Sequence, residues 1–349
     1  MFAFNYGSDA MVLRPDTRPG DVAKMFERAR KAAPEGSGIV FSLNAERLPS
    51  RELCQAAARA AGTDGPVELY VLGDAQNLDP ETIATFAGLQ HLNLNARNMN
   101  DLSFLPAFSE LRSLTIQGQS GKKVSLAFLR HMPRLQQLAI PANVSDQHAL
   151  TACAELVLLS CTSALPTFLA LEGHPSLTYL AASFGTNRDI SPLANVPQLR
   201  GLEIYQVRGL VGDDLNPLGE FPKLSALSLG ALRNVSHLRA LRQAPSRTLR
   251  ALLLEALPNL ADLEDIAACT SLTQLGLYDS RPLDKRLAPL RRTERLTHLV
   301  LGDVYPKSEI EQLLSWYHGA LRYRDKIERG DFKPRWRTRV EELDRDAAE

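Results

Sequence analysis

The sequence predicts an α/β solenoid, in which short coils stack with parallel strands along one side and helical segments along the other. Two observations support this fold class. The 349-residue chain repeats the pattern Leu-x-x-Leu-x-Leu at intervals of 21 to 25 residues, and a second apolar group recurs between successive copies. Internal repeats of this length are typical of chains that grow by stacking coils instead of enlarging one core.

Ten segments carry the repeat, and their first and fourth positions are leucine in every copy. The sixth position is leucine or isoleucine except at Cys161 and Ala182. Alternate side chains of a strand point to opposite faces, so the fourth and sixth residues should point into the coil. The segments begin at Leu89, Leu111, Leu135, Leu156, Leu177, Leu199, Leu224, Leu249, Leu272 and Leu296.

The second apolar group is expected to close each coil on the convex side. Examples are Ile190 with Leu193, and Leu260 with Leu263 and Ile266. One coil cannot bury its apolar face alone, so neighbouring coils must stack into a continuous core. The strands of the stack would then form one curved parallel sheet with a concave outer face.

This pattern resembles the leucine-rich-repeat superfamily, in its short bacterial form with repeats of roughly 22 residues, as in internalins and phosphatase regulators. The stretch NRDISPLANVPQLRGLEI, Asn187 to Ile204, is similar to internalin repeats, in which an Asp-Ile-x-Pro-Leu segment forms the convex turn. The resemblance covers residues 67–305 and implies a leucine-rich-repeat horseshoe. It does not specify a function, because one solenoid serves many partners.

The chain departs from this family at the ninth position of the repeat, where asparagine is common. Asn143 fits, whereas Val207, Leu232 and Leu257 occupy the same position in other copies. We therefore expect apolar side chains to fill turns that an asparagine amide would otherwise bond.

Caps are expected at both ends of the solenoid. Residues 1–66 should form an N-terminal cap of degenerate repeats, followed by about 10 to 11 repeats over residues 67–305. The VELYVL segment fits the motif with Val67, Tyr70 and Leu72 pointing inward. The cap elements are a helix over 20–33, a strand over 38–43 and a helix over 50–61 with Ser50 as its N-cap.

Residues 306–349 should form a C-terminal helical cap and a charged tail. Residues 319–340 interleave basic with aromatic side chains, a composition that would suit contact with nucleic acid. A solvated helix, or a tail folded back on the solenoid, is the alternative. The apolar face of the cap helix consists of Ile310, Leu313, Leu314 and Tyr317, with Trp316 able to cover the last coil.

Composition and motifs limit the function classes. Lys plus Arg and Asp plus Glu each number 40, so no net charge favours nucleic acid or membrane. We find no membrane-spanning run, no signal-peptide pattern and no zinc spacing among the four cysteines, which favours a cytoplasmic protein. The resemblance to short bacterial leucine-rich repeats implies a bacterial one. Nucleophile-elbow, P-loop and HExxH motifs are absent, so no catalytic residue, metal or cofactor is expected.

The candidate site is the concave face, at the third, fifth, seventh and eighth positions of the strands. None of these positions carries Lys or Arg, whereas five carry acids: Asp74, Glu203, Glu255, Asp279 and Asp303. Tyrosines anchor protein partners and carboxylates attract basic ones, whereas phosphates would be repelled. The alternative is that strand geometry alone disfavours long cationic side chains. The candidate partner-binding residues are Tyr179, Phe184, Glu203, Tyr205, Glu255, Tyr278, Asp279, Arg281, Asp303 and Tyr305.

The segments LYDSRP and LGDVYP end two neighbouring strands and should place Asp279 beside Asp303. The pair would clamp a basic side chain of a partner, or Arg281 would satisfy it within a structural turn. A cation site lacks enough oxygen ligands, and acid–base catalysis lacks an enclosed pocket.

The sequence therefore predicts a protein-binding module for a basic partner, not an enzyme. One concrete form is an immunity or inhibitor protein for a cationic toxin, and a scaffold or regulator is the general form. The alternative from another class is a nucleic-acid-associated protein that uses the basic, aromatic C-terminal segment.

Overall fold

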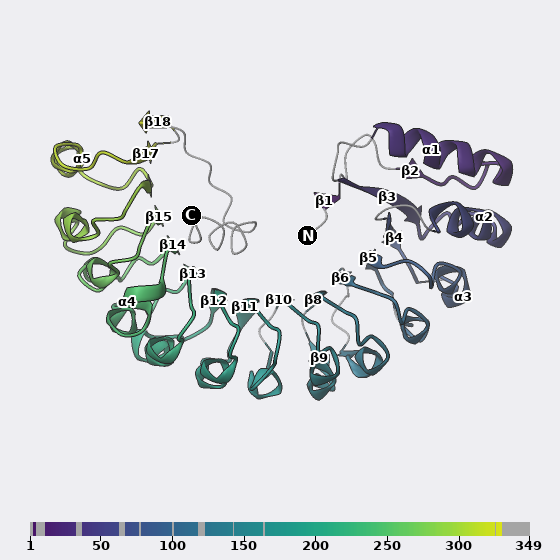
Figure 1. The fold of residues 1–349 in the computed structure, drawn as a ribbon, viewed down its shortest axis with the longest axis horizontal. Coiled ribbons are helices and arrows are strands. Elements are labelled where there is room, and N and C mark those ends of the chain that lie inside the picture. The colour runs from purple at the N-terminus through teal and green to yellow at the C-terminus, as the bar shows by residue number, and fades with distance from the viewer. Residues whose placement is uncertain are drawn as a thin grey trace. The chain divides into compact units, whose positions relative to one another are not determined.

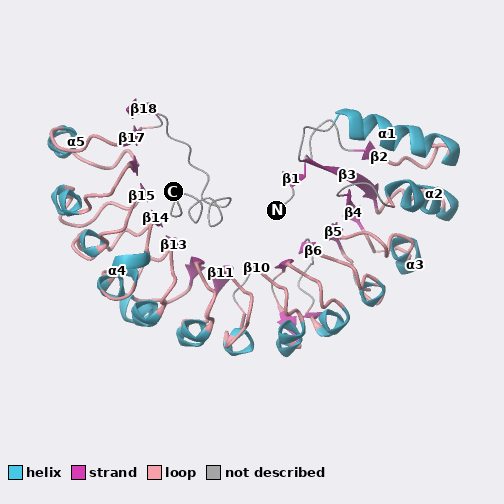
Figure 2. Ribbon diagram, in the orientation of Figure 1, coloured by secondary structure: helices cyan, strands magenta, loops and turns pink. Residues whose placement is uncertain are grey.

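The computed structural model describes residues 3–4, 11–32, 37–62, 67–76, 78–99, 101–117, 123–141, 143–162, 165–324 and 326–329. The chain forms two compact units, residues 1–162 and 163–349. In each unit a strand alternates with a helical segment, and the helical segments lie on the side opposite the strands (Figures 1 and 2).

The N-terminal unit contains a parallel sheet in the order β1-β3-β4-β5-β6-β8-β10, with β2 paired to β3. A second, two-stranded sheet pairs β7 with β9. The helices are α1 (Val22–Ala32), α2 (Arg51–Ala61) and α3 (Pro80–Ala84), and later coils close with short 3-10 helices. The strands are β1 (Ala3–Phe4), β2 (Met11–Val12), β3 (Ser37–Asn44), β4 (Val67–Asp74), β5 (His91–Arg97), β6 (Ser113–Gln117), β7 (Val124–Ser125), β8 (Gln137–Ile140), β9 (Val144–Ser145) and β10 (Leu158–Thr162).

The C-terminal unit continues the same plan. Strands β11 to β17 are parallel neighbours in chain order, and β18 pairs antiparallel with β17. The α-helices are α4 (Pro245–Thr248) and α5 (Lys307–Leu314). The strands are β11 (Tyr179–Gly185), β12 (Gly201–Val207), β13 (Ala226–Gly230), β14 (Ala251–Glu255), β15 (Gln274–Tyr278), β16 (His298–Leu301), β17 (Ala320–Tyr323) and β18 (Lys326–Arg329).

Stacked leucines form the core of the C-terminal unit. The fourth positions of five successive repeats pair with one another across the sheet, and all are at most 2% exposed. Val207, Leu232 and Leu257 are buried in the turns, as their apolar character predicts. These observations confirm the α/β solenoid. The stacked leucines are Leu202, Leu227, Leu252, Leu275 and Leu299.

The helices and strands of the N-terminal segment lie close to their predicted ranges. The Ser50 hydroxyl caps α2 by accepting a hydrogen bond from the Leu53 amide at 3.2 Å. Phe41 of β3 lies between Phe26 of α1 and Phe86, with ring centroids 5.6 and 5.5 Å apart. These three rings give the first coils an aromatic core.

The predicted frame of β4 is wrong by one residue. Leu69 and Val71 pair with the inward-pointing Leu92 and Leu94 of β5 and are fully buried, whereas Tyr70 is half-buried. A shift of one residue exchanges the two faces of a strand, so Tyr70 and Leu72, not Leu69 and Val71, face outward.

The C-terminal segment also differs from its prediction. Helix α5 buries Ile310 and Leu313, as expected. The stack does not end at this helix, because β17 (Ala320–Tyr323) and β18 (Lys326–Arg329) follow where a charged tail was predicted. The rest of that tail, residues 330–349, lies outside the described residues.

The eighth position of the repeat adopts a left-handed backbone in much of the chain. Gly73 has φ of 96°. Five successive repeats of the C-terminal unit place residues other than glycine there, which costs roughly 1 kcal/mol each. These residues are Phe184, Gln206, Ala231, Ala256 and Asp279, with φ of 53°, 53°, 52°, 51° and 46°.

Replacement of Gly73 by alanine is expected to lower the free energy of unfolding by about 1 to 2 kcal/mol. The added Cβ would lie 2.9 Å from Asn44 Oδ1, which is held in place by the Glu46 amide at 2.8 Å. The reverse change, Ala256→Gly, should alter stability by no more than about 0.5 kcal/mol, because relief of strain offsets added chain entropy. Urea unfolding followed by circular dichroism measures both, and equal effects would contradict the prediction.

Candidate functional site

Five of the predicted partner-binding residues lie together on the outward face of β11, β12 and β14. They line a groove of about 550 Å³ on the sheet, together with Ser183, Ser228 and Leu253. We call this the aromatic–acidic groove. The five residues are Tyr179, Phe184, Glu203, Tyr205 and Glu255.

Small residues on neighbouring strands leave room for the large side chains of the groove. In the sheet register, Tyr205 pairs with Ser183 on one side and with Gly230 on the other. A Cβ atom on Gly230 would lie 2.3 Å from Tyr205 Cδ2, so the ring lies directly over the Gly230 backbone. Gly230 is therefore required by this close approach and not by its φ angle.

The aromatic rings and carboxylates of the groove differ in their exposure and in their partners. Phe184 is 44% exposed, and its ring meets Tyr205 edge-on with centroids 6.0 Å apart. The Tyr179 hydroxyl donates to Glu203 Oε2 at 3.0 Å. Within the described residues Glu255 makes no ion pair, and no Lys or Arg lines the groove. The groove thus offers an exposed ring beside two carboxylates.

Four other predicted residues line a separate hollow of about 530 Å³ at the ends of β15 and β16. Asp303 forms an ion pair with Arg324 Nε at 2.5 Å, and Arg324 also lies over the Tyr323 ring at 5.0 Å. Arg281 donates to the Val304 carbonyl at 3.1 Å. Asp303 is therefore paired with Arg324. From the sequence, the predicted cation at the aspartate pair was either a basic side chain of a partner or Arg281. The four residues are Asp279, Arg281, Asp303 and Tyr305.

Tyr305 is a structural residue and not a surface anchor, which corrects its assignment as a partner contact. Its side chain is buried, and its hydroxyl donates to the Ser280 carbonyl at 2.9 Å. Burial raises the pKa of the Tyr305 hydroxyl, so this group stays protonated. Ser280 is buried too, and its hydroxyl accepts from the Leu257 amide at 3.1 Å. Tyr278, the remaining predicted residue, is half-buried on β15.

The structure adds to the outward face a strand that lies beyond the predicted repeats, and this strand carries a cation. Arg322 of β17 pairs with Val300 of β16 at the fifth position of the repeat. This repeat begins with His318 instead of leucine, and only Leu321 and Tyr323 preserve the motif. The absence of Lys and Arg therefore applies to the strands of the predicted repeats and not to β17.

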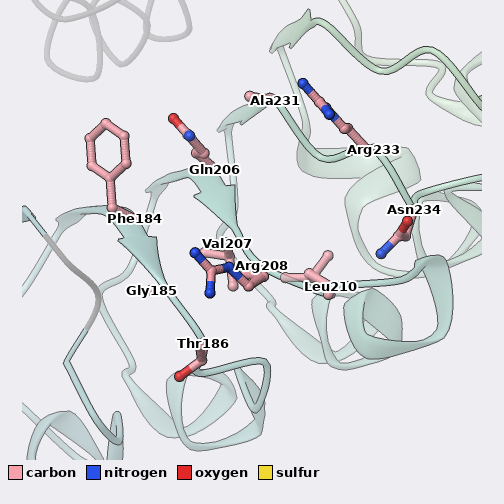
Figure 3. A pocket seen from close by; sticks show the side chains of 11 residues that line it. Phe184, Gly185, Thr186, Gln206, Val207, Arg208, Leu210, Ala231, Arg233 and Asn234 are labelled. Atoms are coloured by element: carbon pink, nitrogen blue, oxygen red, sulfur yellow. The ribbon is translucent and has the colours of Figure 1, made fainter.

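Sequence reasoning did not predict a further hollow, which lies next to the aromatic–acidic groove. It lies at the carboxyl ends of β11 to β13 and shares Phe184 with the groove (Figure 3). Arg208 and Arg233 line it, and both occupy the tenth position of their repeats. A comparison of the tenth positions of all repeats would have identified these two arginines.

The repeat and the parallel sheet define a solenoid protein, and comparisons with solved structures agree. An internalin from Listeria monocytogenes is similar over 90% of this chain and 95% of its own, with 17% identity and a TM-score of 0.55. A leucine-rich-repeat protein from Leptospira interrogans is similar over 82% of this chain and 72% of its own, with 16% identity and a TM-score of 0.57. The chain therefore shares the leucine-rich-repeat fold of these two proteins.

Other comparisons add no relative. No family model matches the sequence, and no curated protein is similar to it in sequence. Within the described residues, no helix has the length and apolar character needed to cross a membrane. The same residues contain no group of three or more His, Cys, Asp or Glu side chains placed to hold a metal ion.

Proposed function

We propose that the protein is a binding module and that the aromatic–acidic groove holds a protein partner. The exposed Phe184 ring, edge-on to Tyr205, is the observation that carries this proposal. Rigid aromatic side chains provide large contact area at a small entropic cost, and they are enriched where binding energy is concentrated. The backbone of Phe184 is left-handed, so the protein retains a strained turn that displays an apolar ring to solvent.

A partner with a basic surface fits the charge of the groove. Glu203 and Glu255 lie within one groove that no described Lys or Arg lines, so an incoming Lys or Arg would gain a favourable contact. An inhibitor or immunity protein for a cationic toxin is the concrete form of this proposal, and a scaffold or regulator is its general form. A bacterial cytoplasmic setting belongs to the same proposal, which the four free, buried thiols support.

Truncation of the two rings tests the proposal. Phe184→Ala and Tyr205→Ala are each expected to weaken binding of the partner by about tenfold, because each removes an anchor worth more than about 1 kcal/mol. The partner is first captured on the wild-type chain and identified, and its dissociation constant is then measured by calorimetry for each variant.

Leu169→Ala is the matched control for these truncations. Leu169 is 59% exposed, but it lies in the 3-10 helix Leu169–Leu171 on the helical side of the unit. Its loss should leave the dissociation constant within about twofold. If the two ring variants bind the identified partner as tightly as Leu169→Ala does, the groove is not the binding site.

A further inference from the structure

The hollow at the carboxyl ends of β11 to β13, here called the rim hollow, has the character of an anion site. It measures about 840 Å³ and lies between the turns that follow three neighbouring strands (Figure 3). Val207 and Leu210 line it and are largely buried, so this part of its lining is apolar. Its exposed polar lining residues are Thr186, Gln206, Arg208, Arg233 and Asn234.

The two arginines of the rim hollow have no acidic partner among the described residues. Arg208 and Arg233 come from neighbouring coils, both are exposed, and neither forms an ion pair within the described residues. Arg188, from the preceding coil, differs: it contacts Asp214 Oδ2 at 3.7 Å and donates to the Gly209 carbonyl at 3.3 Å.

The two acids that follow β12, Asp213 and Asp214, contact groups other than Arg208 and Arg233. Asp214 Oδ2 accepts from the Val211 amide at 2.9 Å, and Asp213 Oδ1 lies 3.3 Å from His237 Nε2. No acid in the described part of the chain therefore competes with a ligand for Arg208 and Arg233. Guanidinium groups bind carboxylates through paired hydrogen bonds.

We infer that the rim hollow binds an acidic side chain of the same protein partner whose basic side chain occupies the aromatic–acidic groove. This inference rests on the proposed function. The two sites share Phe184, and β12 leads from Glu203 in the groove to Arg208 at the rim. The partner would therefore be recognised by a bipolar segment and not by a uniformly basic one.

The chain from Glu203 to Arg208 limits the spacing of the two charges in the partner. The two residues are five positions apart, and a fully extended chain of that length would span roughly 16 Å at about 3.3 Å per residue. The left-handed backbone of Gln206 bends the chain between them, so this length is an upper limit. A partner segment that lies extended along the strands would need its basic and acidic residues no more than about five positions apart. An aromatic or aliphatic residue between them would contact Phe184.

Selection from a phage-displayed library of random peptides on the full chain tests this inference. Wild-type protein should enrich peptides that carry a basic and an acidic residue no more than about five positions apart. Selection on the Arg208→Glu/Arg233→Glu variant should lose the acidic residue and keep the basic one. Synthetic copies of the wild-type peptides should bind this variant at least tenfold more weakly.

A variant with the same change of charge provides the control. Arg239 and Arg247 are exposed on the helical side of a neighbouring coil, in the 3-10 helix Arg239–Arg242 and in α4. Arg239→Glu/Arg247→Glu should bind the peptides within twofold of wild type. An equal loss in both double variants would mean a general charge effect and would overturn the inference.

The remaining outcomes separate the inference from the proposed function. Enrichment of basic and apolar residues without an acid would retain the aromatic–acidic groove as a binding site and reject the anion site. Peptides whose binding survives Glu203→Lys/Glu255→Lys but not Arg208→Glu/Arg233→Glu would reject the groove's charge role and retain the rim hollow as an anion site. A library from which no peptide is enriched would reject both.

Discussion

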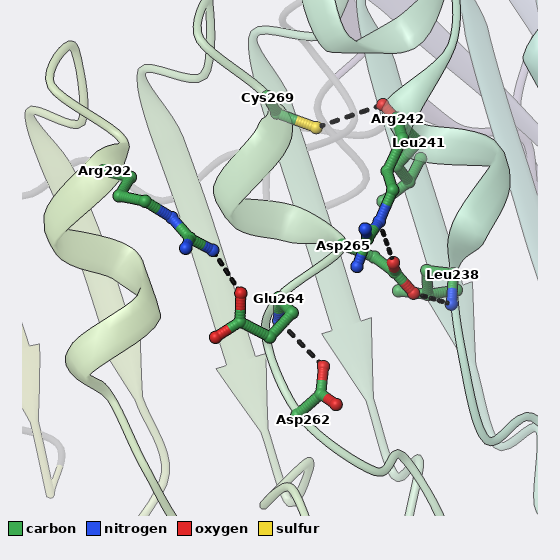
Figure 4. Close-up of polar contacts among 8 residues, drawn as sticks. All are labelled: Leu238, Leu241, Arg242, Asp262, Glu264, Asp265, Cys269 and Arg292. Carbon is green, nitrogen blue, oxygen red and sulfur yellow. Dashed lines mark hydrogen bonds and ion pairs between the residues drawn. The ribbon is translucent and has the colours of Figure 1, made fainter.

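Replacement of Asp265 by alanine is expected to lower the free energy of unfolding by about 3 kcal/mol. Its side chain is 9% exposed and joins two successive coils on the helical side of the C-terminal unit (Figure 4). One carboxylate oxygen accepts from the Leu238 amide at 2.8 Å, and the other accepts from Arg242 Nε at 2.5 Å.

Two losses combine in this variant. The Leu238 amide belongs to a residue that is 1% exposed, and a buried donor without a partner costs about 1 to 3 kcal/mol. The charge-assisted hydrogen bond to Arg242 is lost as well. Asp265→Asn should cost about half as much, because its amide oxygen still accepts from Leu238 but carries no charge.

The neighbouring residue supplies a matched control. Glu264 also forms an ion pair across coils, with Arg292, but its side chain is 44% exposed (Figure 4). Water screens such a pair, so Glu264→Ala should cost less than about 1 kcal/mol. Chemical unfolding of both variants measures the difference. Equal losses would show that the Asp265 carboxylate does not hold the coils together.

The repeat period alone predicted the fold, because stacked leucines depend on local spacing. The fourth and sixth positions of the motif pair in register through the C-terminal unit, as Leu202 and Leu227 illustrate. Register is harder to predict where the motif is degenerate. In VELYVL every residue except Glu68 is apolar or aromatic, so the sequence fits the motif equally well in two alignments that differ by one residue. The pairing with β5 shows that Leu69 and Val71 are the inward-pointing residues.

The candidate site was only partly predictable. Strand alternation brought Tyr179, Glu203 and Tyr205 to one face, and their grouping with Glu255 follows from the sheet register. The burial of Tyr305 was not predictable, because it depends on a turn that brings its hydroxyl to the Ser280 carbonyl. The ion pair of Asp303 required the additional strand β17, whose sequence barely preserves the motif.

Acidification from pH 7 to pH 5 is expected to remove about 2 kcal/mol of stability through His91 alone. His91 begins β5, and its side chain is 7% exposed. Burial, and secondarily the charge of Arg112, lowers the pKa of the imidazole from 6.5 to about 4. Glu68 of β4 and Ser113 of β6 are its neighbours in the sheet register.

The sign follows from proton binding. Above pH 6.5 the imidazole is neutral in both states, so titration of His91 takes nothing from stability. Between pH 6.5 and about 4 the unfolded chain binds a proton that the folded protein excludes, and stability is therefore lost as the pH falls. At pH 5, which is 1.5 pH units below the unfolded value, the loss amounts to about 2 kcal/mol.

His91→Gln isolates this contribution, because glutamine does not titrate. Its free energy of unfolding should decrease by about 2 kcal/mol less than that of the wild type between pH 7 and pH 5, whatever its stability at pH 7. His148→Gln is the control for the loss of a histidine as such, since His148 is exposed. Parallel pH curves for His91→Gln and the wild type would show that the folded protein accommodates a protonated His91, and that burial does not keep the ring neutral.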